Sequence, residues 1–148
     1  MSKTSKARAA ARLAAVQALY QMDMEVIGLA RLLGQFHEHR LGKEIEDAQL
    51  IDADIDFFDD VVVGTDGRLA DIDSLIEANL GDHWKIVGLD KSMLHILRAG
   101  TYEIIARPDV PTGTIINEYM DVAHAFFDAK DAKFVNGLLD AVAKAKRV

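Results

Sequence analysis

The basic residues at the start of the chain form the first group whose types and spacing suggest chemistry. Lys3, Lys6, Arg8 and Arg12 lie within the first 22 residues, where there is no acidic residue. Arg8 and Arg12 are four positions apart, so in a helix they share one face. Such a patch favours phosphate contacts, and four phosphates of a single strand give a slope of log affinity against log salt of about −2.8. The alternative is a basic tail that only improves solubility.

A second group lies near the other end, in the run Lys133-Phe134-Val135-Asn136-Gly137. A base, an aromatic ring and an amide can contact a phosphate, stack on a nucleobase and read its edge. Phe134 also precedes Leu138 by four positions, and that helical spacing favours a place in the core. A core ring predicts that Phe134→Ala costs about 3–5 kcal/mol of stability. A stacking ring predicts a loss of about 1–3 kcal/mol of RNA affinity, and we expect a partly exposed ring that does some of both.

Other patterns do not support metal binding or catalysis. His37-Glu38-His39 places its histidines two positions apart, so they do not share a helix face. The run Asp52-Ala53-Asp54-Ile55-Asp56 begins like a calcium loop, but Phe57 replaces the required glycine and Val63 the required glutamate. The chain has no cysteine, no glycine-rich phosphate loop and no nucleophile motif. The sequence therefore predicts no catalytic residue, no metal ligand and no cofactor.

Charge is unevenly distributed along the 148 residues, whose net charge is −7. Residues 1–22 carry four bases, and residues 141–148 carry three. Residues 23–140 carry ten bases and all 24 acids, which gives a net charge of −14. Basic ends on an acidic body favour a polyanion at the ends and a basic protein on the body. A solvated acidic face with frayed basic tails is the alternative.

The start of the chain also needs a test for targeting segments. Its alanine- and arginine-rich, acid-free composition imitates an organelle transit peptide. Leu13, Val16 and Tyr20 recur at helical spacing, however, and this indicates a retained first helix. No apolar run reaches the roughly 18 residues that a membrane span requires. With the absence of cysteine, these features favour a cytoplasmic protein without a membrane partner.

Apolar residues recur at helical spacing in almost every segment, which predicts an all-α protein with essentially no β-sheet. The expected helices cover about 4–23, 26–40, 52–80, 91–107 and 112–126, and a last one carries Phe134 and Val142. Val61-Val62-Val63 is the weak point, because it could be a short strand. Gly81 to Gly88 is the best hinge, so we expect one domain over 1–148 with lobes of about 1–81 and 82–148.

Blocks in the same order resemble the NusB family of transcription antitermination factors. They are Ala11–Gln21, Leu97–Ile104, Asp109–Pro111, Ile116–Glu118 and Lys133–Asp140. The resemblance implies an all-α fold of two small helical bundles packed at an angle, with about seven helices and no catalysis. NusB-like proteins bind the boxA element of nascent ribosomal RNA leaders as single-stranded RNA. They do so together with NusE, a small-subunit ribosomal protein, and help RNA polymerase pass terminators.

The resemblance also implies two sets of site residues. The RNA-binding residues would be Lys3, Lys6, Arg8, Arg12, Asp131, Lys133 and Phe134. The NusE-binding residues would be Tyr20, Trp84 and Asp90. An acidic body suits a basic ribosomal partner. Alanines separate the bases of the first helix, so we expect weak RNA affinity alone, with NusE supplying much of the binding.

Two other functions stay open at this point. A protein-binding helical adaptor without its own RNA affinity would explain the thin basic patch. The same helical module also occurs at the start of RNA cytosine methyltransferases, but those enzymes need a catalytic cysteine, which is absent here. Direct RNA binding, measured with and without NusE, separates the adaptor from the antitermination factor.

Overall fold

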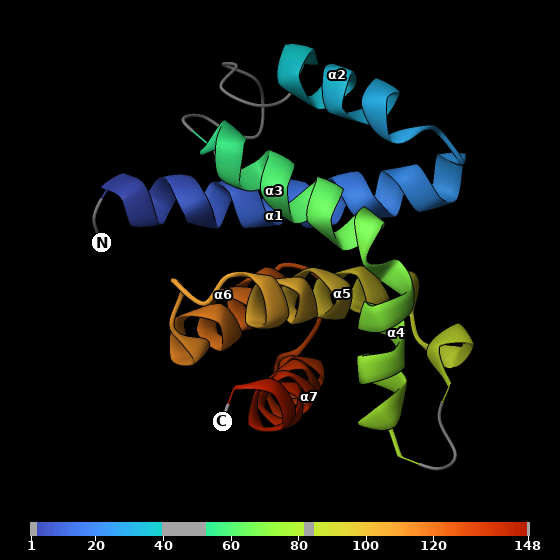
Figure 1. The fold of residues 1–148 in the computed structure, drawn as a ribbon, viewed down its shortest axis with the longest axis vertical. Coiled ribbons are helices and arrows are strands. Elements are labelled where there is room, and N and C mark those ends of the chain that lie inside the picture. Colours follow the sequence, from blue (N-terminus) through green and yellow to red (C-terminus); the bar gives the residue numbers. More distant parts are fainter. Residues whose placement is uncertain (1–2, 40–52, 82–84, 148) are drawn as a thin grey trace. The chain divides into compact units, whose positions relative to one another are not determined.

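The computed structural model describes residues 3–39, 53–81 and 85–147. The elements in chain order are α1 (Lys3–Glu25), α2 (Leu29–His39), α3 (Ile55–Gly67), α4 (Leu69–Ala78), the short 3-10 helix η2 (Ile86–Gly88), α5 (Lys91–Ala106), α6 (Thr112–His124) and α7 (Ala129–Lys146) (Figure 1). These ranges contain no strand. The prediction of an all-α fold with about seven helices is therefore confirmed.

The valines that could have formed a strand lie inside α3. Val61 and Val62 are fully buried, and each lies one helical turn after a buried phenylalanine, Phe57 or Phe58. Burial of this stripe stabilises the helix even though valine is a weak helix former. The strand alternative is wrong, because helical spacing is what buries these side chains together.

The N-terminal compact unit ends at Gly64 and contains α1, α2 and most of α3. Small side chains cover the buried side of α1, where neighbouring helices can approach closely. They are Ala10, Ala11, Ala14, Ala15 and Ala18. Phe36 of α2 stacks on Phe58 of α3 with ring centroids 5.5 Å apart, and Gln21 Nε2 donates to Gln35 Oε1 at 3.1 Å. The apolar stack and this hydrogen bond join the three helices.

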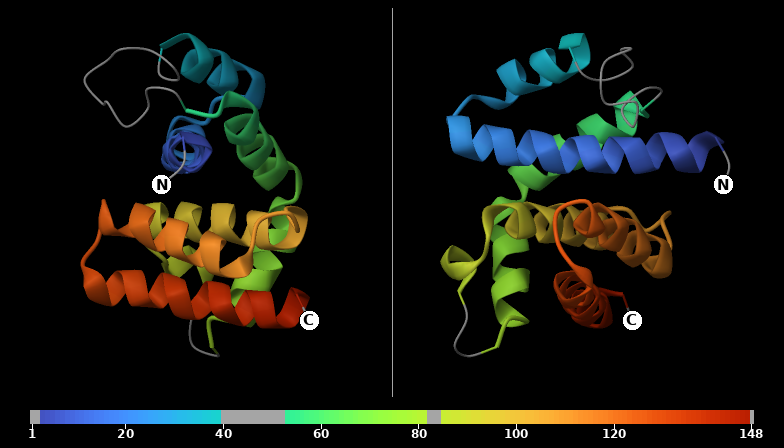
Figure 2. Two further views of the ribbon diagram at one scale, coloured as in Figure 1. Left: turned by 90° about the vertical axis from the view of Figure 1, so that its left-hand side faces the viewer. Right: turned by 180° about the vertical axis from the view of Figure 1, so that it is seen from behind.

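The C-terminal compact unit begins at Thr65 and is built around α5. Helix α5 packs against α4, α6 and α7, and the two views of Figure 2 show α6 and α7 running beside it. Gly100 marks the closest approach, because a Cβ atom there would lie 2.8 Å from Leu139 Cδ1. Only glycine leaves room for α5 and α7 to approach this closely at position 100.

The division between the units differs from the expected one. The predicted lobes met near Gly81, whereas the compact units meet between Gly64 and Thr65. The reason is that α4 packs on α5, η2 and α7, which places it in the C-terminal unit. Glycine-rich composition marked a connection in the chain, but the packing of α4 decides where the unit begins.

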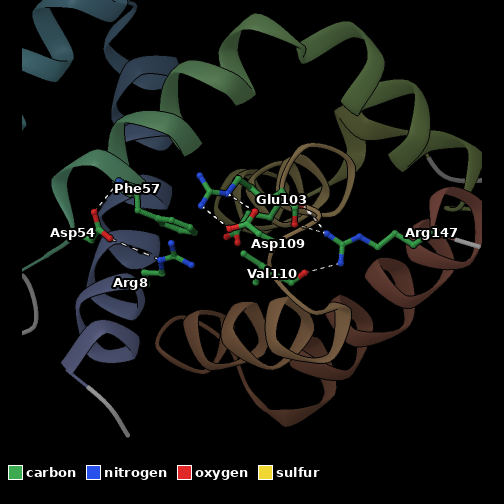
Figure 3. Close-up of polar contacts among 8 residues, drawn as sticks. Arg8, Asp54, Phe57, Glu103, Asp109, Val110 and Arg147 are labelled. Carbon is green, nitrogen blue, oxygen red and sulfur yellow. Dashed lines mark hydrogen bonds and ion pairs between the residues drawn. The ribbon is translucent and has the colours of Figure 1, made fainter.

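The turn between α5 and α6 contains Pro108 and Pro111, as the sequence predicted. Arg147 holds this turn with its guanidinium (Figure 3). Its Nε donates to Ile104 O at 2.8 Å, Nη1 to Val110 O at 2.7 Å and Nη2 to Arg107 O at 2.7 Å. Ile104 lies in the last turn of α5, and Arg107 and Val110 follow the helix, where carbonyl oxygens lack intrahelical donors. Arg147 supplies donors to all three and reinforces the turn in which Val110 N donates to Arg107 O at 3.0 Å.

Candidate nucleic-acid interface

All four bases predicted to bind RNA at the start of the chain belong to α1. Lys3 begins the helix, and Lys6 is exposed. The first turn of α1 has no acidic residue, so its positive charges oppose the helix dipole. A bound anion would offset this unfavourable arrangement. The surroundings of Arg8 and Arg12 differ from those of the two lysines.

Arg8 and Arg12 both lie against the ring of Phe57, a residue of α3. The Cζ atoms of Arg8 and Arg12 are 4.7 Å and 4.8 Å from the ring centroid. These are cation–π distances, and Phe57 itself is 3% exposed. The prediction that the two arginines share one helix face is confirmed. Sequence reasoning did not identify the aromatic ring that this face packs against.

Arg12 does not have the surroundings expected of a phosphate contact. Its side chain is 1% exposed, among the largest fully buried side chains of the described residues. The expectation that Arg12 extends an exposed basic patch is therefore corrected. The small alanines of α1 let the neighbouring helices approach closely, and this packing encloses the guanidinium of Arg12. Arg12 has the position of a structural residue.

Arg8 is partly exposed and has an acidic neighbour. Asp54 Oδ2 lies 3.8 Å from Arg8 Nε, and the two side chains are 30% and 32% exposed. Asp54 Oδ1 also accepts a hydrogen bond from Phe57 N at 3.0 Å, which caps the start of α3 (Figure 3). The helix cap thus places a carboxylate beside the more exposed of the two arginines.

The second group of predicted RNA residues lies at the start of α7. Asp128 accepts from Asp131 N and caps the helix, so Ala129 is already helical. This start places Asp131 and Phe134 three positions apart on one face. Lys133 is exposed on the same turn. The capped helix thus brings three predicted residues close together.

A pocket of about 540 Å³ opens beside these residues. Asp131 and Phe134 line it, and so does Asp90, which was assigned to the protein partner. The remaining lining residues are Leu80, Gly88, Leu89, Met93, Phe127 and Lys130. The pocket therefore combines aromatic and aliphatic walls with charges of both signs. Lys130 shares the helical spacing of Asp131 and Phe134, and that signal could have identified it.

The exposure of Phe134 agrees with its predicted intermediate position. The ring is 39% exposed, whereas Leu138, one turn later, is 4% exposed. The helical spacing therefore did not place both residues in the core. A ring that is partly exposed at a pocket can pack against the protein with one part and against a ligand with another. This arrangement suits a stacking contact.

The residues predicted to bind the protein partner are distributed over both units. Tyr20 is 38% exposed on α1 in the N-terminal unit. Asp90 caps α5 by accepting from Ser92 N at 2.8 Å and Met93 N at 3.2 Å. Trp84 lies outside the described residues. Asp90 thus caps α5 and lines the pocket, and a contact with the protein partner would be an additional role.

The histidine pattern considered for a metal site has another use in the structure. His37 Nε2 lies 2.6 Å from Asp59 Oδ1, which ties α2 to α3. In the ranges that the structure describes, no three His, Asp or Glu side chains are arranged to hold a metal ion. Among the described helices, none combines the length and apolarity that crossing a membrane requires.

Comparisons with known proteins agree with each other. The model of the NusB family matches residues 9–144. The transcription antitermination protein NusB of Novosphingobium aromaticivorans is 62% identical over 144 residues, which cover 97% of both chains. The protein of the same name from Sphingopyxis alaskensis is 55% identical over 147 residues, which cover 99% of both chains.

Solved structures show the same fold. The crystal structure of antitermination factors NusB and NusE in complex with double-stranded RNA contains a chain with a TM-score of 0.78 and 27% identity. That match covers 98% of this chain and 99% of the other. The NusB structure from T. maritima has a TM-score of 0.76 and 28% identity, covering 93% and 90% of the two chains. Matched along almost its whole length in sequence and in fold, the chain belongs to the NusB family.

Proposed function

We propose that this chain is a transcription antitermination factor that binds boxA-like single-stranded RNA of ribosomal RNA leaders together with NusE. It acts in the cytoplasm as part of the RNA polymerase antitermination complex, without catalysis. The observation that carries this proposal is the pocket at the start of α7, where an exposed ring and charged side chains meet in a chain of the NusB family.

The pocket supplies the contacts that a single-stranded nucleotide needs. Phe134 offers a ring face for stacking, which is worth about 1–3 kcal/mol for each base. The carboxylate of Asp131 can accept a hydrogen bond from an amino group on a base edge. Lys130 and Lys133 are exposed and can neutralise phosphates on either side of the base. These residues together read a base and position the strand.

The start of α1 adds affinity without reading sequence. Lys3, Lys6 and Arg8 are the bases that remain for phosphates once the buried Arg12 is set aside. Contacts with phosphates strengthen binding to all sequences about equally. Sequence preference in this proposal therefore comes from the α7 pocket, and salt sensitivity comes largely from α1.

NusE is the proposed protein partner, with Tyr20, Trp84 and Asp90 in its contact surface. The net charge of −14 over residues 23–140 supports a basic partner, because opposite charges steer the encounter. The solved complex of a related NusB with NusE and RNA supports the same assembly. Chemical-shift mapping with NusE tests it. Shifts at Tyr20 and in residues 84–90 are expected, and shifts confined to other surfaces would overturn the assignment.

A protein-binding adaptor without RNA affinity of its own is the second candidate. The packing of Arg8 and Arg12 on Phe57 favours it, because this packing uses part of the basic patch inside the protein. An RNA methyltransferase remnant has less support. The curated relatives match along 97% to 99% of their own length, so they carry no large additional catalytic domain.

RNA binding with and without NusE distinguishes the candidates. The probes are single-stranded boxA RNA, a scrambled strand of the same composition and a duplex of the boxA sequence. The antitermination factor binds boxA more tightly than the scrambled strand, and NusE increases that affinity. An adaptor binds NusE, but NusE together with the chain then binds RNA no more tightly than NusE alone. That result would overturn the proposed function.

A further inference from the structure

The carboxylate of Asp54 lies beside Arg8, the partly exposed arginine on the basic face of α1. Asp54 is held from two sides, because its N–H donates to Ala7 O at 3.0 Å and its Oδ1 accepts from Phe57 N at 3.0 Å. The other oxygen, Oδ2, lies 3.8 Å from Arg8 Nε. Carboxylates and phosphates present similar oxygens to a guanidinium, so both can use the same site on Arg8.

The pair of Arg8 and Asp54 is loose enough to be replaced. The 3.8 Å separation is too long for a hydrogen bond, and within the described residues the buried Arg8 Nε has no hydrogen-bond acceptor. Both side chains are about one third exposed, and pairs of this kind contribute only about 0–1 kcal/mol. An incoming phosphate therefore competes with Asp54 at a small cost.

Arg8 keeps its place when this carboxylate is displaced. Its guanidinium rests 4.7 Å from the centroid of Phe57, and this contact does not depend on Asp54 Oδ2. Arg12, which contacts the same Phe57 ring, is buried and cannot bind the phosphate in place of Arg8. Within the described side chains of α1, Arg8 is therefore the arginine whose charge the RNA and Asp54 would share.

We propose that Asp54 is an internal competitor that lowers the RNA affinity of the α1 basic face. The proposal rests on the proposed RNA-binding function and adds its regulation. Asp54 neutralises part of the charge of Arg8 in the free protein, and a phosphate can form a full ion pair with Arg8 only by displacing the carboxylate. This competition weakens RNA binding by the chain alone, and additional contacts from a protein partner can offset it.

The variant Asp54→Asn removes the charge and keeps the helix cap, because asparagine caps helices about as well as aspartate. We expect its affinity for single-stranded boxA RNA to rise by about two- to fivefold, the range that a weak exposed pair allows. The slope of log affinity against log salt becomes steeper by up to about 0.7, as for one more phosphate contact. Asp56→Asn is the matched control, since it removes one negative charge two residues away from an exposed position.

A double variant separates local competition from a general change in charge. In an Arg8→Ala background, Asp54→Asn should leave RNA affinity unchanged, because the competed charge is gone. Equal gains for Asp54→Asn and Asp56→Asn would overturn the proposal, as would a gain that persists without Arg8. RNA affinities are measured for the chain alone, where the competition should have its largest effect, and again with NusE present, and the melting temperatures are compared. If the parent chain binds no RNA at all, the proposed function fails first and the competitor proposal fails with it.

Discussion

At the start of α1, two arginines lie over the ring of Phe57, and one of them also has Asp54 beside it. At the start of α7, by contrast, Phe134 and Asp131 line an open pocket of about 540 Å³. Both regions combine an aromatic ring with charges of both signs. In α1 these groups are largely engaged with each other, whereas in α7 they surround space that a ligand can enter.

The difference shows that residue types alone do not determine whether a charged or aromatic side chain remains accessible to a ligand. A base beside a ring is a binding feature only when the protein has not already enclosed it. Arg12 is 1% exposed and has become part of the packing, while Phe134 keeps 39% of its surface exposed. We therefore assign sequence readout to the α7 pocket and general phosphate affinity to α1.

The largest expected effect tests the turn between α5 and α6 that Arg147 holds. Arg147→Ala removes the donors to Ile104 O, Val110 O and Arg107 O and should lower the free energy of unfolding by about 3 kcal/mol. Chemical denaturation measures this loss. Lys146→Ala, an exposed neighbour, is the control and should change stability by less than about 0.5 kcal/mol. Equal stability of the two variants would show that the turn does not depend on Arg147.

The next effect separates the two arginines of α1. Arg12→Ala should cost about 2–3 kcal/mol of stability, because it removes a buried guanidinium from the ring of Phe57. Arg8→Ala should cost less stability, since Arg8 is partly exposed, but should flatten the salt slope of RNA binding by up to about 0.7, less whatever part Asp54 already cancels. Denaturation and salt titration of both variants provide the test. A flattened slope with unchanged stability for Arg12→Ala would return that residue to the RNA surface.

The third effect concerns the pocket itself. Phe134→Ala should weaken RNA binding by about 1–3 kcal/mol, with a smaller loss of stability than a buried ring would cause. Phe126→Ala is the matched control, because Phe126 is 45% exposed and is not part of the pocket lining. Affinity and melting temperature are measured on the same preparations. RNA affinity equal to that of the parent would refute the stacking role.

The smallest effect concerns a single exposed lysine. Lys6→Ala should flatten the salt slope by about 0.7 without changing the preference for boxA over scrambled RNA. With Arg12 buried, the α1 contribution to the slope should lie between about −1.4 for the two lysines alone and about −2.1 with Arg8 fully engaged, instead of −2.8 for four bases. Lys144→Ala, which removes an exposed lysine from the other end of α7, should leave the slope unchanged. A smaller preference for boxA in Lys6→Ala would assign base readout to α1.

Much of the fold could be predicted from local patterns. Asp90 is an aspartate just before an apolar stripe, and it caps α5 as expected. Gly100 lies on that stripe and faces Leu139 at the closest helix approach. The run Val61-Val62-Val63 was ambiguous because valine favours strands. In the structure it is helical, and Val61 and Val62 are buried one turn after Phe57 and Phe58.

The site was less predictable, because its decisive contacts join residues far apart in the chain. Nothing in the local pattern around Arg8 and Arg12 points to Phe57 or Asp54, which follow more than 40 residues later. In the sequence, Asp54 belongs only to a run that fails as a calcium loop, and nothing in that run points to Arg8. The spacing of Lys130, Asp131 and Phe134 could have indicated one face, but the wall formed by α5 and η2 depends on tertiary packing.

The most direct test compares how the two regions affect sequence discrimination. The measurement is the ratio of affinities for single-stranded boxA and scrambled RNA, with NusE present, for the parent, Phe134→Ala and Lys6→Ala. We predict that Phe134→Ala lowers this ratio, whereas Lys6→Ala weakens both affinities equally and keeps the ratio of the parent. A ratio that stays at the parent value in Phe134→Ala and falls in Lys6→Ala would contradict the assignment of readout to the α7 pocket.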